Sequence, residues 1–392
     1  MPSPAAPGLY LHVPFCSAVC PYCDFAVRTG GRERRARFVA HLLAEIELWA
    51  GAAPPLGGFD TVYLGGGTPS CLLPDELARI LEAARGRLGV APGARVFLEA
   101  NPEDVTPESL AAWRALGVAT VSLGVQSFAE ADLAFLGRRH GAAAARRCVE
   151  LALAAGFETV SIDLIYGLPE GLPGGSVSGW RRTLAEAVRL APHHLSCYQL
   201  TVHDGTPFGA RRDRGALREL PGEAQAGLFA LTHAFLADAG YPAYEVSNFA
   251  RAPEHRSRHN RKYWEHTPYL GLGPSAHSFD GCRRWWNERG LDAWERRVAA
   301  GERPEAGGET LGREELALEA LLLGLRSVEG VDLAALRDRY AVDLLGANAL
   351  LVERLAADGL VARRGDRLVP SPAGLAVADG LAAAFVLAPA AS

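Results

Sequence analysis

Lysine and methionine are almost missing from this chain of 392 residues. Lys262 is the only lysine beside 39 arginines, and Met1 is the only methionine. A phosphate-binding loop that ends in Gly-Lys-Ser/Thr is therefore excluded, because Lys262 does not stand in that motif. An internal methionine ligand for a metal or a haem is excluded as well. The formal net charge of −5 gives no electrostatic reason to expect a nucleic-acid partner.

Long apolar runs are also absent. No run reaches the roughly 18 residues of a membrane helix, and the opening MPSPAAPG lacks the basic and apolar regions of a secretory signal. The seven cysteines are an odd number, which is typical of a chain whose thiols stay reduced. We therefore expect a cytoplasmic protein without an integral membrane segment, in which clustered thiols are ligands or catalysts.

Short β-rich runs alternate with helical patterns from residue 9 to about residue 235. The runs are 9–14, 61–67, 95–101, 119–126, 159–167 and 194–202, and the clearest helix is 106–117, with Thr106 as its N-cap. Strands that alternate with helices predict a parallel α/β sheet with helices outside it. Six βα units are fewer than the eight of a closed barrel, so a partial (β/α)6 TIM-like barrel and an open sheet both fit the pattern over 1–235.

The remainder of the chain divides into two predicted parts. Residues 236–308 are rich in aromatic residues and histidine and are expected to form an irregular extension. Residues 309–392 contain helical patterns and a short hairpin with its turn at Gly365 and Asp366, which predicts a small helical, winged-helix-like domain. Residues 313–392 hold eight arginines against eleven acidic residues, so this domain is expected to cover or dock rather than to read DNA.

Polar or special residues stand where each predicted strand finishes. They are Cys16 to Cys23, Gly65 to Gly67, Glu99 and Asn101, Gln126, Asp163, and Gln199 and Thr201. In barrels of parallel strands the carboxyl-terminal rim carries the chemistry. The pattern therefore predicts one shared site at the strand ends.

The first strand is followed by three cysteines, Cys16, Cys20 and Cys23, with the spacing C-x3-C-x2-C. A zinc finger or ribbon would need a second pair at similar spacing, and bacterial ferredoxins use C-x2-C-x2-C. Three thiolates can hold three irons of a [4Fe–4S] cluster and leave the fourth iron open to a small molecule. A zinc-binding structural protein stays an alternative, which iron, sulfide and zinc analysis would separate.

The same loop, with Tyr22 before its last cysteine, resembles the radical S-adenosylmethionine superfamily. That resemblance implies a partial barrel of the radical SAM type, with S-adenosylmethionine chelating the open iron of the cluster. It also implies which residues contact S-adenosylmethionine. These are Tyr10, Tyr22, Gly66, Gly67 and Thr68 of the GGGTP run, Glu99, Gln126, Arg138 and Asp163.

Nearly the whole chain resembles the oxygen-independent coproporphyrinogen III oxidase (HemN-like) group. Three features favour its haem chaperone branch, HemW. Phe25 stands where the decarboxylase carries a further cysteine, Cys16 lies close to the start, and HNRKYW from His259 to Trp264 matches the HNxxYW motif associated with haem binding. This branch implies that haem binds at His259 and passes to an acceptor protein, and that an electron donor serves the cluster.

Two histidines add to this comparison. His277 is a second candidate haem ligand, whereas His203 replaces the usual glutamate of an LTxE run, which leaves the role of that position open. The alternative function within the group is an enzyme that oxidatively decarboxylates coproporphyrinogen III to protoporphyrinogen IX, so the resemblance alone does not decide whether the protein is an enzyme.

Overall fold

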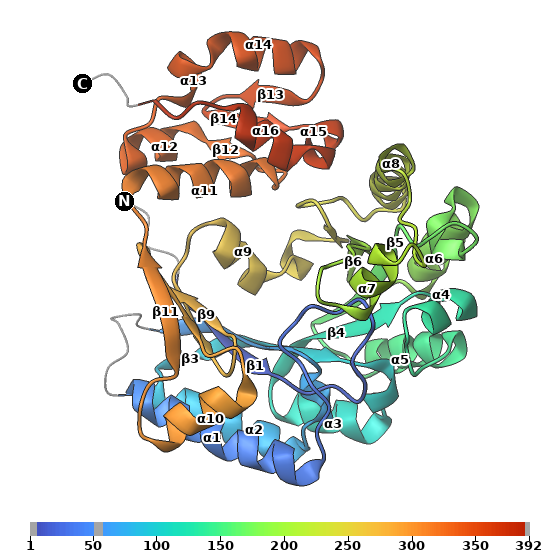
Figure 1. The fold of residues 1–392 in the computed structure, drawn as a ribbon, viewed down its shortest axis with the longest axis vertical. Coiled ribbons are helices and arrows are strands. Elements are labelled where there is room, and N and C mark those ends of the chain that lie inside the picture. Colours follow the sequence, from blue (N-terminus) through green and yellow to red (C-terminus); the bar gives the residue numbers. More distant parts are fainter. Residues whose placement is uncertain (1–5, 51–57, 389–392) are drawn as a thin grey trace.

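A large sheet wrapped by helices forms the main body of the computed structural model, which describes residues 6–50 and 58–388 (Figure 1). Its parallel strands are β1 (Gly8–Val13), β2 (Phe59–Gly66), β3 (Val90–Ala100), β4 (Val118–Gln126), β5 (Thr159–Tyr166) and β6 (His194–Gln199). The helices between them are α1 (Arg32–Ala50), α2 (Pro74–Arg87), α3 (Pro107–Ala115), α4 (Glu130–Phe135), α5 (Ala142–Ala154) and α6 (Val177–Leu190), and α7 (Pro207–Asp213) and α8 (Gly222–Asp238) follow β6.

The sheet curves but does not close. Its strand order is β11-β10-β9-β8-β1-β2-β3-β4-β5-β6-β7, so β7 (Asn248–Ala250) and β11 (Glu305–Thr310) are its edges, and the structure pairs neither edge with the other within the described residues. The strand centres are buried, as expected where helices cover one face and the sheet curves over the other. The predicted partial barrel of six βα units is thereby confirmed.

The segment expected to be irregular instead extends the sheet. It contains α9 (Arg258–Trp264), β8 (Tyr269–Leu272), β9 (His277–Phe279), β10 (Arg283–Asn287) and α10 (Leu291–Ala299) in addition to the two edge strands. Strand β8 pairs in parallel with β1, and β9, β10 and β11 continue from it in antiparallel order. Strands of three to six residues carry too little periodicity to be recognised in the sequence. The limits of this segment as a separate domain, 236–308, stay a prediction.

The C-terminal unit has an apolar core of its own, which includes Leu321, Leu325 and Leu368. Its helices are α11 (Arg313–Leu325), α12 (Leu333–Tyr340), α13 (Leu344–Ala347), α14 (Ala349–Ala357), α15 (Pro372–Ala376) and α16 (Ala378–Ala384). A small sheet of order β12-β14-β13 joins them, with β12 (Val331–Asp332), β13 (Val361–Arg364) and β14 (Arg367–Pro370). Figure 1 shows this unit above α9, while α1, α2 and α3 lie on the opposite side of the main sheet. No helix among the described residues is long and apolar enough to cross a membrane.

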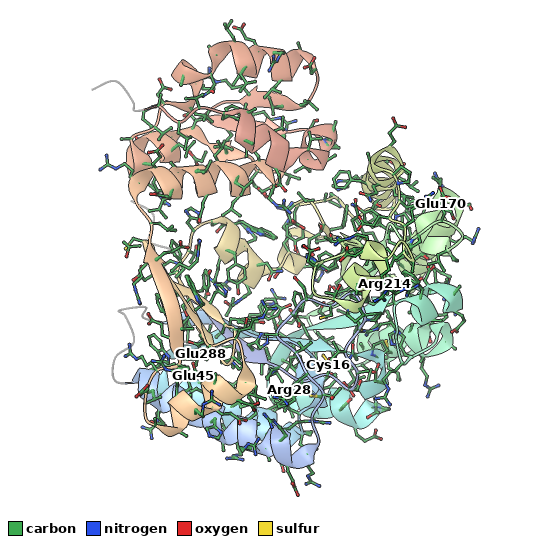
Figure 2. All side chains as sticks on the ribbon, in the orientation of Figure 1. Cys16, Arg28, Glu45, Glu170, Arg214 and Glu288 are labelled. Atoms are coloured by element: carbon green, nitrogen blue, oxygen red, sulfur yellow. The ribbon has the colours of Figure 1, made fainter. Side chains whose placement is uncertain are left out.

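A buried carboxylate ties the added strands to the first helix. Glu45 of α1 has no exposed surface and accepts hydrogen bonds from the Gly273 backbone at 2.7 Å, from Asn287 Nδ2 at 2.6 Å and from Trp294 Nε1 at 3.0 Å. Gly273 in turn lies directly against the end of β1, where a Cβ would stand 2.5 Å from the His12 carbonyl oxygen. Glu45 therefore ties α1 to Gly273, which packs against the end of β1, just before the cysteine loop begins. Figure 2 shows Glu45 beside Glu288.

We expect Glu45→Ala to destabilise the protein by about 3 kcal/mol, because it leaves buried donors without an acceptor.

The contribution of the native Glu45 carboxyl group to stability also depends on pH. Burial raises the pKa of Glu45 from 4.5 to about 7, so the folded state holds this proton more tightly than the unfolded state. Its contribution to stability is therefore lost as the pH rises from about 4.5 to about 7. Unfolding of the native protein and of Glu45→Gln between pH 5 and pH 8 measures this. A stability difference that does not change with pH would contradict the assignment.

Candidate functional site

The carboxyl ends of the parallel strands and the cysteine loop enclose a cavity of about 470 Å³. That volume lies within the range of small-molecule sites in proteins. The cavity wall contains the cysteines Cys16, Cys20 and Cys23 together with side chains or backbone from β2, β3, β4, β5 and β6. Among the wall residues are Tyr22, Gly66, Gly67, Thr68, Glu99, Asn101, Ser122, Gln126, Arg138, Asp163, Tyr198 and His203. The shared site predicted at the strand ends is thus assembled by the fold.

The loop that carries the cysteines joins β1 to α1 and is held at its base. Cys16 N donates to the Arg28 carbonyl oxygen at 3.0 Å, and Arg28 N donates to the Pro14 carbonyl oxygen at 2.8 Å. Phe15, which is fully buried, packs edge-on against Phe38 of α1. These contacts pin both ends of the loop, so that the segment with Cys20 and Cys23 faces the cavity.

Two glycines let the end of β2 approach this loop. At Gly67 a Cβ would stand 2.6 Å from the Phe15 carbonyl oxygen and 3.0 Å from Cys16 Sγ. Gly67 N donates to Val13 O at 2.8 Å, and Thr68 N donates to Phe15 O at 2.7 Å. Gly66 has a φ of 109°, a conformation that favours glycine. The glycine run therefore works as a backbone platform beside the thiols.

A hydrogen-bonded chain of side chains joins two of the thiols. Thr68 Oγ1 donates to Cys16 Sγ at 3.5 Å, and Asn101 Nδ2 donates to Thr68 Oγ1 at 2.9 Å. Arg138 closes the chain, since its Nη2 donates to Asn101 Oδ1 at 2.5 Å and its Nη1 to Cys20 Sγ at 3.4 Å. Sequence reasoning placed Asn101 only among the polar strand ends. The structure shows that Asn101 links Thr68 to Arg138.

Burial dominates the electrostatics of the cavity. It raises the pKa of Cys16 to about 11, so the thiol needs a positive partner to become a thiolate. Arg138 is that kind of partner, because it lies against Cys20 and its charge lowers the pKa of Cys16. Burial likewise raises the pKa of Glu99 to about 7 and that of Asp163 to about 6. The cavity thus has a fixed cation near the sulfurs. The carboxyl groups at its floor have pKa values close to neutral pH.

The floor carboxyl groups are oriented by neighbours. Glu99 accepts from Tyr63 Oη at 2.7 Å and from Gly66 N at 3.1 Å, and Asp163 accepts from Ser122 Oγ at 3.2 Å. Carboxyl groups held in this way can still accept from the hydroxyl groups of a ligand, because each oxygen has two lone pairs.

The predicted contacts of S-adenosylmethionine separate into two groups. Eight of the nine predicted residues, from Tyr22 to Asp163 along the chain, lie in the cavity wall. Tyr10 is not part of that wall. Its hydroxyl group is hydrogen-bonded to His12 Nδ1 at 3.1 Å, and its ring lies 3.1 Å from the position that a Cβ of Gly65 would occupy. In this structure Tyr10 supports the glycine run from below, and its direct contact with a ligand stays a prediction.

The three thiols do not form a ready-made site for one metal ion. Among residues 6–50 and 58–388, no three His, Cys, Asp or Glu side chains are grouped so that they could hold a single ion. A cubane cluster does not need such convergence, because each of its thiolates binds a different iron. Three cysteines around one cavity, with an arginine beside them and a backbone platform opposite, are a donor set that fits a cluster with one open iron.

The candidate haem ligand His259 lies elsewhere. It is 1% exposed and packs near the start of β1 and β2, where Thr61 Oγ1 is 2.9 Å from its Nδ1 and Tyr263 Oη is 2.9 Å from its Nε2. Burial lowers the pKa of this imidazole to about 3, so it is neutral. Both ring nitrogens are thus engaged by hydroxyl groups.

His277 is the opposite case. It is exposed on β9, and its ring lies 5.8 Å from that of Trp286 at an angle of 33°. In the described part of the chain, which includes all eleven histidines, it is the one histidine with neither ring nitrogen in a hydrogen bond or an ion pair. The structure therefore presents His277, and not His259, as a histidine with free nitrogens.

Comparison with known proteins agrees with this architecture. The family model of the Radical SAM superfamily matches residues 10–171, and that of the HemN C-terminal domain matches residues 311–377. Coproporphyrinogen III oxidase (HemN) from Escherichia coli has the same fold, with a TM-score of 0.81 and 24% identity over 97% of this chain and 90% of that one. The chain is thus a radical S-adenosylmethionine protein of the HemN-like group.

Relatives in sequence narrow the assignment. A protein named heme chaperone HemW from Mycobacterium tuberculosis is 40% identical over 384 residues, which cover 97% of this chain and 95% of that protein. The protein of the same name from Escherichia coli is 37% identical over 272 residues, 69% of each chain. The chain belongs to the HemW family.

We expect Gly67→Ala to prevent cluster assembly without unfolding the protein, because the added methyl group overlaps the Phe15 carbonyl oxygen and presses on Cys16. After anaerobic reconstitution, iron should fall from about four per chain to below about one. Gly86→Ala in α2 is the matched control, since nothing lies within 4 Å of its added Cβ. Iron and sulfide analysis with circular dichroism measures both. Normal cluster content in Gly67→Ala would show that the close approach is not required.

Proposed function

We propose that this protein is a haem chaperone that binds haem and transfers it to an acceptor protein in the cytoplasm, and that it carries a [4Fe–4S] cluster with S-adenosylmethionine. The observation that carries the proposal is its 40% identity over nearly its full length to a protein named heme chaperone HemW. The cavity that joins three cysteines to the glycine platform supports the cluster.

In this proposal Cys16, Cys20 and Cys23 hold the cluster, which when bound supplies the electron for reductive cleavage of the sulfonium group. The chain itself does the binding. Arg138 would bind the methionyl carboxylate as a fixed cation, and the Gly66–Gly67 backbone would hold the methionyl end. Glu99 and Asp163, which Tyr63 and Ser122 orient, would accept from the ribose hydroxyl groups.

Two histidines compete as the haem ligand. The HNxxYW motif assigns it to His259, which becomes available to iron only after α9 moves and its contacts with Thr61 and Tyr263 are replaced. His277 needs no such opening, because it is exposed beside Trp286. His259 is the ligand in an opened state of α9, and His277 is the competing site.

Two variants decide between these histidines. We expect His259→Ala to weaken haem binding by about tenfold or more, because the iron loses its protein ligand. His277→Ala, an exposed substitution, is the comparison. Haem titration followed by the Soret band gives both dissociation constants. Thermal unfolding of the same samples separates lost ligation from lost packing, since His259 is buried. The reverse order of affinities would move the iron to His277.

An anaerobic turnover assay separates the chaperone from the oxidase alternative. Reconstituted protein of known iron and sulfide content receives S-adenosylmethionine, a reductant and coproporphyrinogen III. We expect no decarboxylated porphyrin, because Phe25 lines the cavity, 64% exposed, where the oxidase carries a further cysteine. Mass spectrometry of porphyrins and 5′-deoxyadenosine is the measurement. Protoporphyrinogen formed over many turnovers would refute the chaperone assignment.

A further inference from the structure

The interior of the barrel is polar beneath the floor of the cavity. In barrels of parallel strands this interior is usually filled by bulky branched side chains. Here a second space of about 60 Å³, the core space, lies toward the amino-terminal ends of the strands, and Glu99, Ser122 and Asp163 line both it and the cavity. Alternate positions of three neighbouring strands face the core space, and each carries a hydroxyl group or an imidazole. They are Thr120 and Ser122 of β4, Thr159 and Ser161 of β5, and His194 and Ser196 of β6.

The core space has the size and the polarity that water requires. A buried water molecule needs about 10–15 Å³ and roughly two to four polar partners. The volume of about 60 Å³ therefore holds about four to six water molecules. Facing side chains two residues apart on one strand are separated by about 7 Å. A single water molecule can bridge that gap between two hydroxyl groups.

The upper end of the core space is formed by the two carboxyl groups of the cavity floor. Asp163 accepts from Ser122 Oγ at 3.2 Å and is also hydrogen-bonded to Ser196, and the charge of Arg138 acts on it from the cavity side. Glu99 accepts from Tyr63 Oη at 2.7 Å. These carboxyl groups are therefore the proton-carrying groups that the cavity and the core space share.

The lower end of the core space reaches the surface at a pair of histidines. Thr159 Oγ1 is 2.9 Å from His255 Nδ1, and the ring centroid of His255 is 4.6 Å from that of His193. Both histidines are half-buried, and neither of their Nε2 atoms has a hydrogen bond within the described residues. Two imidazoles with a free nitrogen thus lie between Thr159 and solvent.

The surroundings of this histidine pair favour its neutral form. Burial lowers the pKa of both His193 and His255, and the charge of Arg251 lowers the pKa of both as well. On His255 the charge of Glu254 acts in the opposite direction, while that of Arg95 adds to the lowering. A neutral imidazole can accept a proton on one nitrogen and release one from the other, which is how histidine carries protons.

A second branch of hydrogen bonds ends inside the protein. Ser161 Oγ is 2.8 Å from His194 Nδ1, and His194 Nε2 is 2.8 Å from Tyr244 Oη. That hydroxyl group also accepts from Ser257 N at 3.1 Å, and Tyr244 is fully buried. This branch therefore holds the wall of the core space but does not lead to solvent, which leaves the histidine pair as the exit.

We infer that the core space is a water-filled proton path, which connects Glu99 and Asp163 with solvent at the His193–His255 pair. The inference rests on the proposed S-adenosylmethionine site. That ligand would cover both carboxyl groups from the cavity side, and its positive sulfonium group and its ribose hydroxyl groups favour ionised carboxyl groups.

The step is a proton transfer alone. When the ligand binds, the O–H bond of a floor carboxyl group breaks, and the proton passes along water molecules and hydroxyl groups to an imidazole nitrogen. The imidazole releases a proton to solvent and returns to its neutral form. No electron moves, and the carboxylate that remains balances the positive charge of the ligand.

Two substitutions interrupt the path away from the ligand contacts. Thr159→Val keeps nearly the same shape and removes the hydroxyl group next to His255, and His255→Ala removes the imidazole at the surface. Neither residue lines the cavity. Thr183→Val on α6 is the matched control, because Thr183 is also a buried threonine but does not line the core space.

The test measures ligand binding and proton release separately. Reconstituted protein is mixed with S-adenosylmethionine in weakly buffered solution between pH 6 and pH 7, where the floor carboxyl groups still carry protons in part. A pH indicator in a stopped-flow instrument follows the released proton, and equilibrium dialysis gives the dissociation constant. We expect Thr159→Val and His255→Ala to release the proton at least about tenfold more slowly than the wild-type protein and Thr183→Val. The dissociation constant should be the same in all four proteins.

Added imidazole separates a proton carrier from a merely structural residue. It should restore the rate of proton release in His255→Ala, because it replaces the lost carrier, and should not change the rate in Thr159→Val. If imidazole fails to restore His255→Ala, the exit at the histidine pair is wrong. Equal rates in all four proteins, or no proton released by the wild-type protein, would overturn the path while the S-adenosylmethionine site stands. A protein that holds its cluster but binds no S-adenosylmethionine would contradict the proposed function, and the proton path with it.

Discussion

The close approach between the end of β2 and the cysteine loop is the constraint on which the site depends. Gly67 lies so near Phe15 and Cys16 that no side chain fits between them, and the two segments exchange backbone hydrogen bonds through Val13 and Thr68. This contact places the loop over the strand ends. Without it the sulfurs would not share a cavity with Glu99 and Asp163, which stand on β3 and β5.

The hydrogen-bonded side chains of Arg138, Asn101 and Thr68 also hold the cysteine loop in place. They engage Cys16 and Cys20 from the barrel side, so the loop is tied to β3 and to the segment after α4 as well as to β2. One cation serves two purposes here. It stabilises thiolates that burial disfavours, and it leaves a positive group facing the space in which a carboxylate-bearing ligand would lie.

The sequence allowed the barrel and its strand-end residues to be predicted because each βα unit is a local pattern. Thr106 illustrates this, since it caps α3 by accepting from Ser109 N at 3.2 Å, as expected from neighbouring residues alone. The strands β8 to β11 escaped prediction because they are short, and because β8 joins the sheet through pairing with the distant β1. The surroundings of His259 could not be predicted either, because the residues that form them are distant in the sequence. Gly8 and Thr61, which contact it, come from the first strands, and Thr61 is 198 residues away in the sequence.

The two proposed centres, the haem site at His259 and the cavity with the three cysteines, lie at opposite ends of strand β2. His259 contacts Thr61 near the start of β2, whereas Gly66 and Gly67 at the end of that strand border the cavity. Five residues of strand separate Thr61 from Gly66, which is about 17 Å. Tyr63 lies between the two ends, because its ring centroid is 5.1 Å from that of His259 and its hydroxyl group donates to Glu99 of the cavity wall at 2.7 Å. The two proposed centres are therefore joined through one strand and one side chain, so a rearrangement around His259 reaches the cavity through Tyr63 and Glu99.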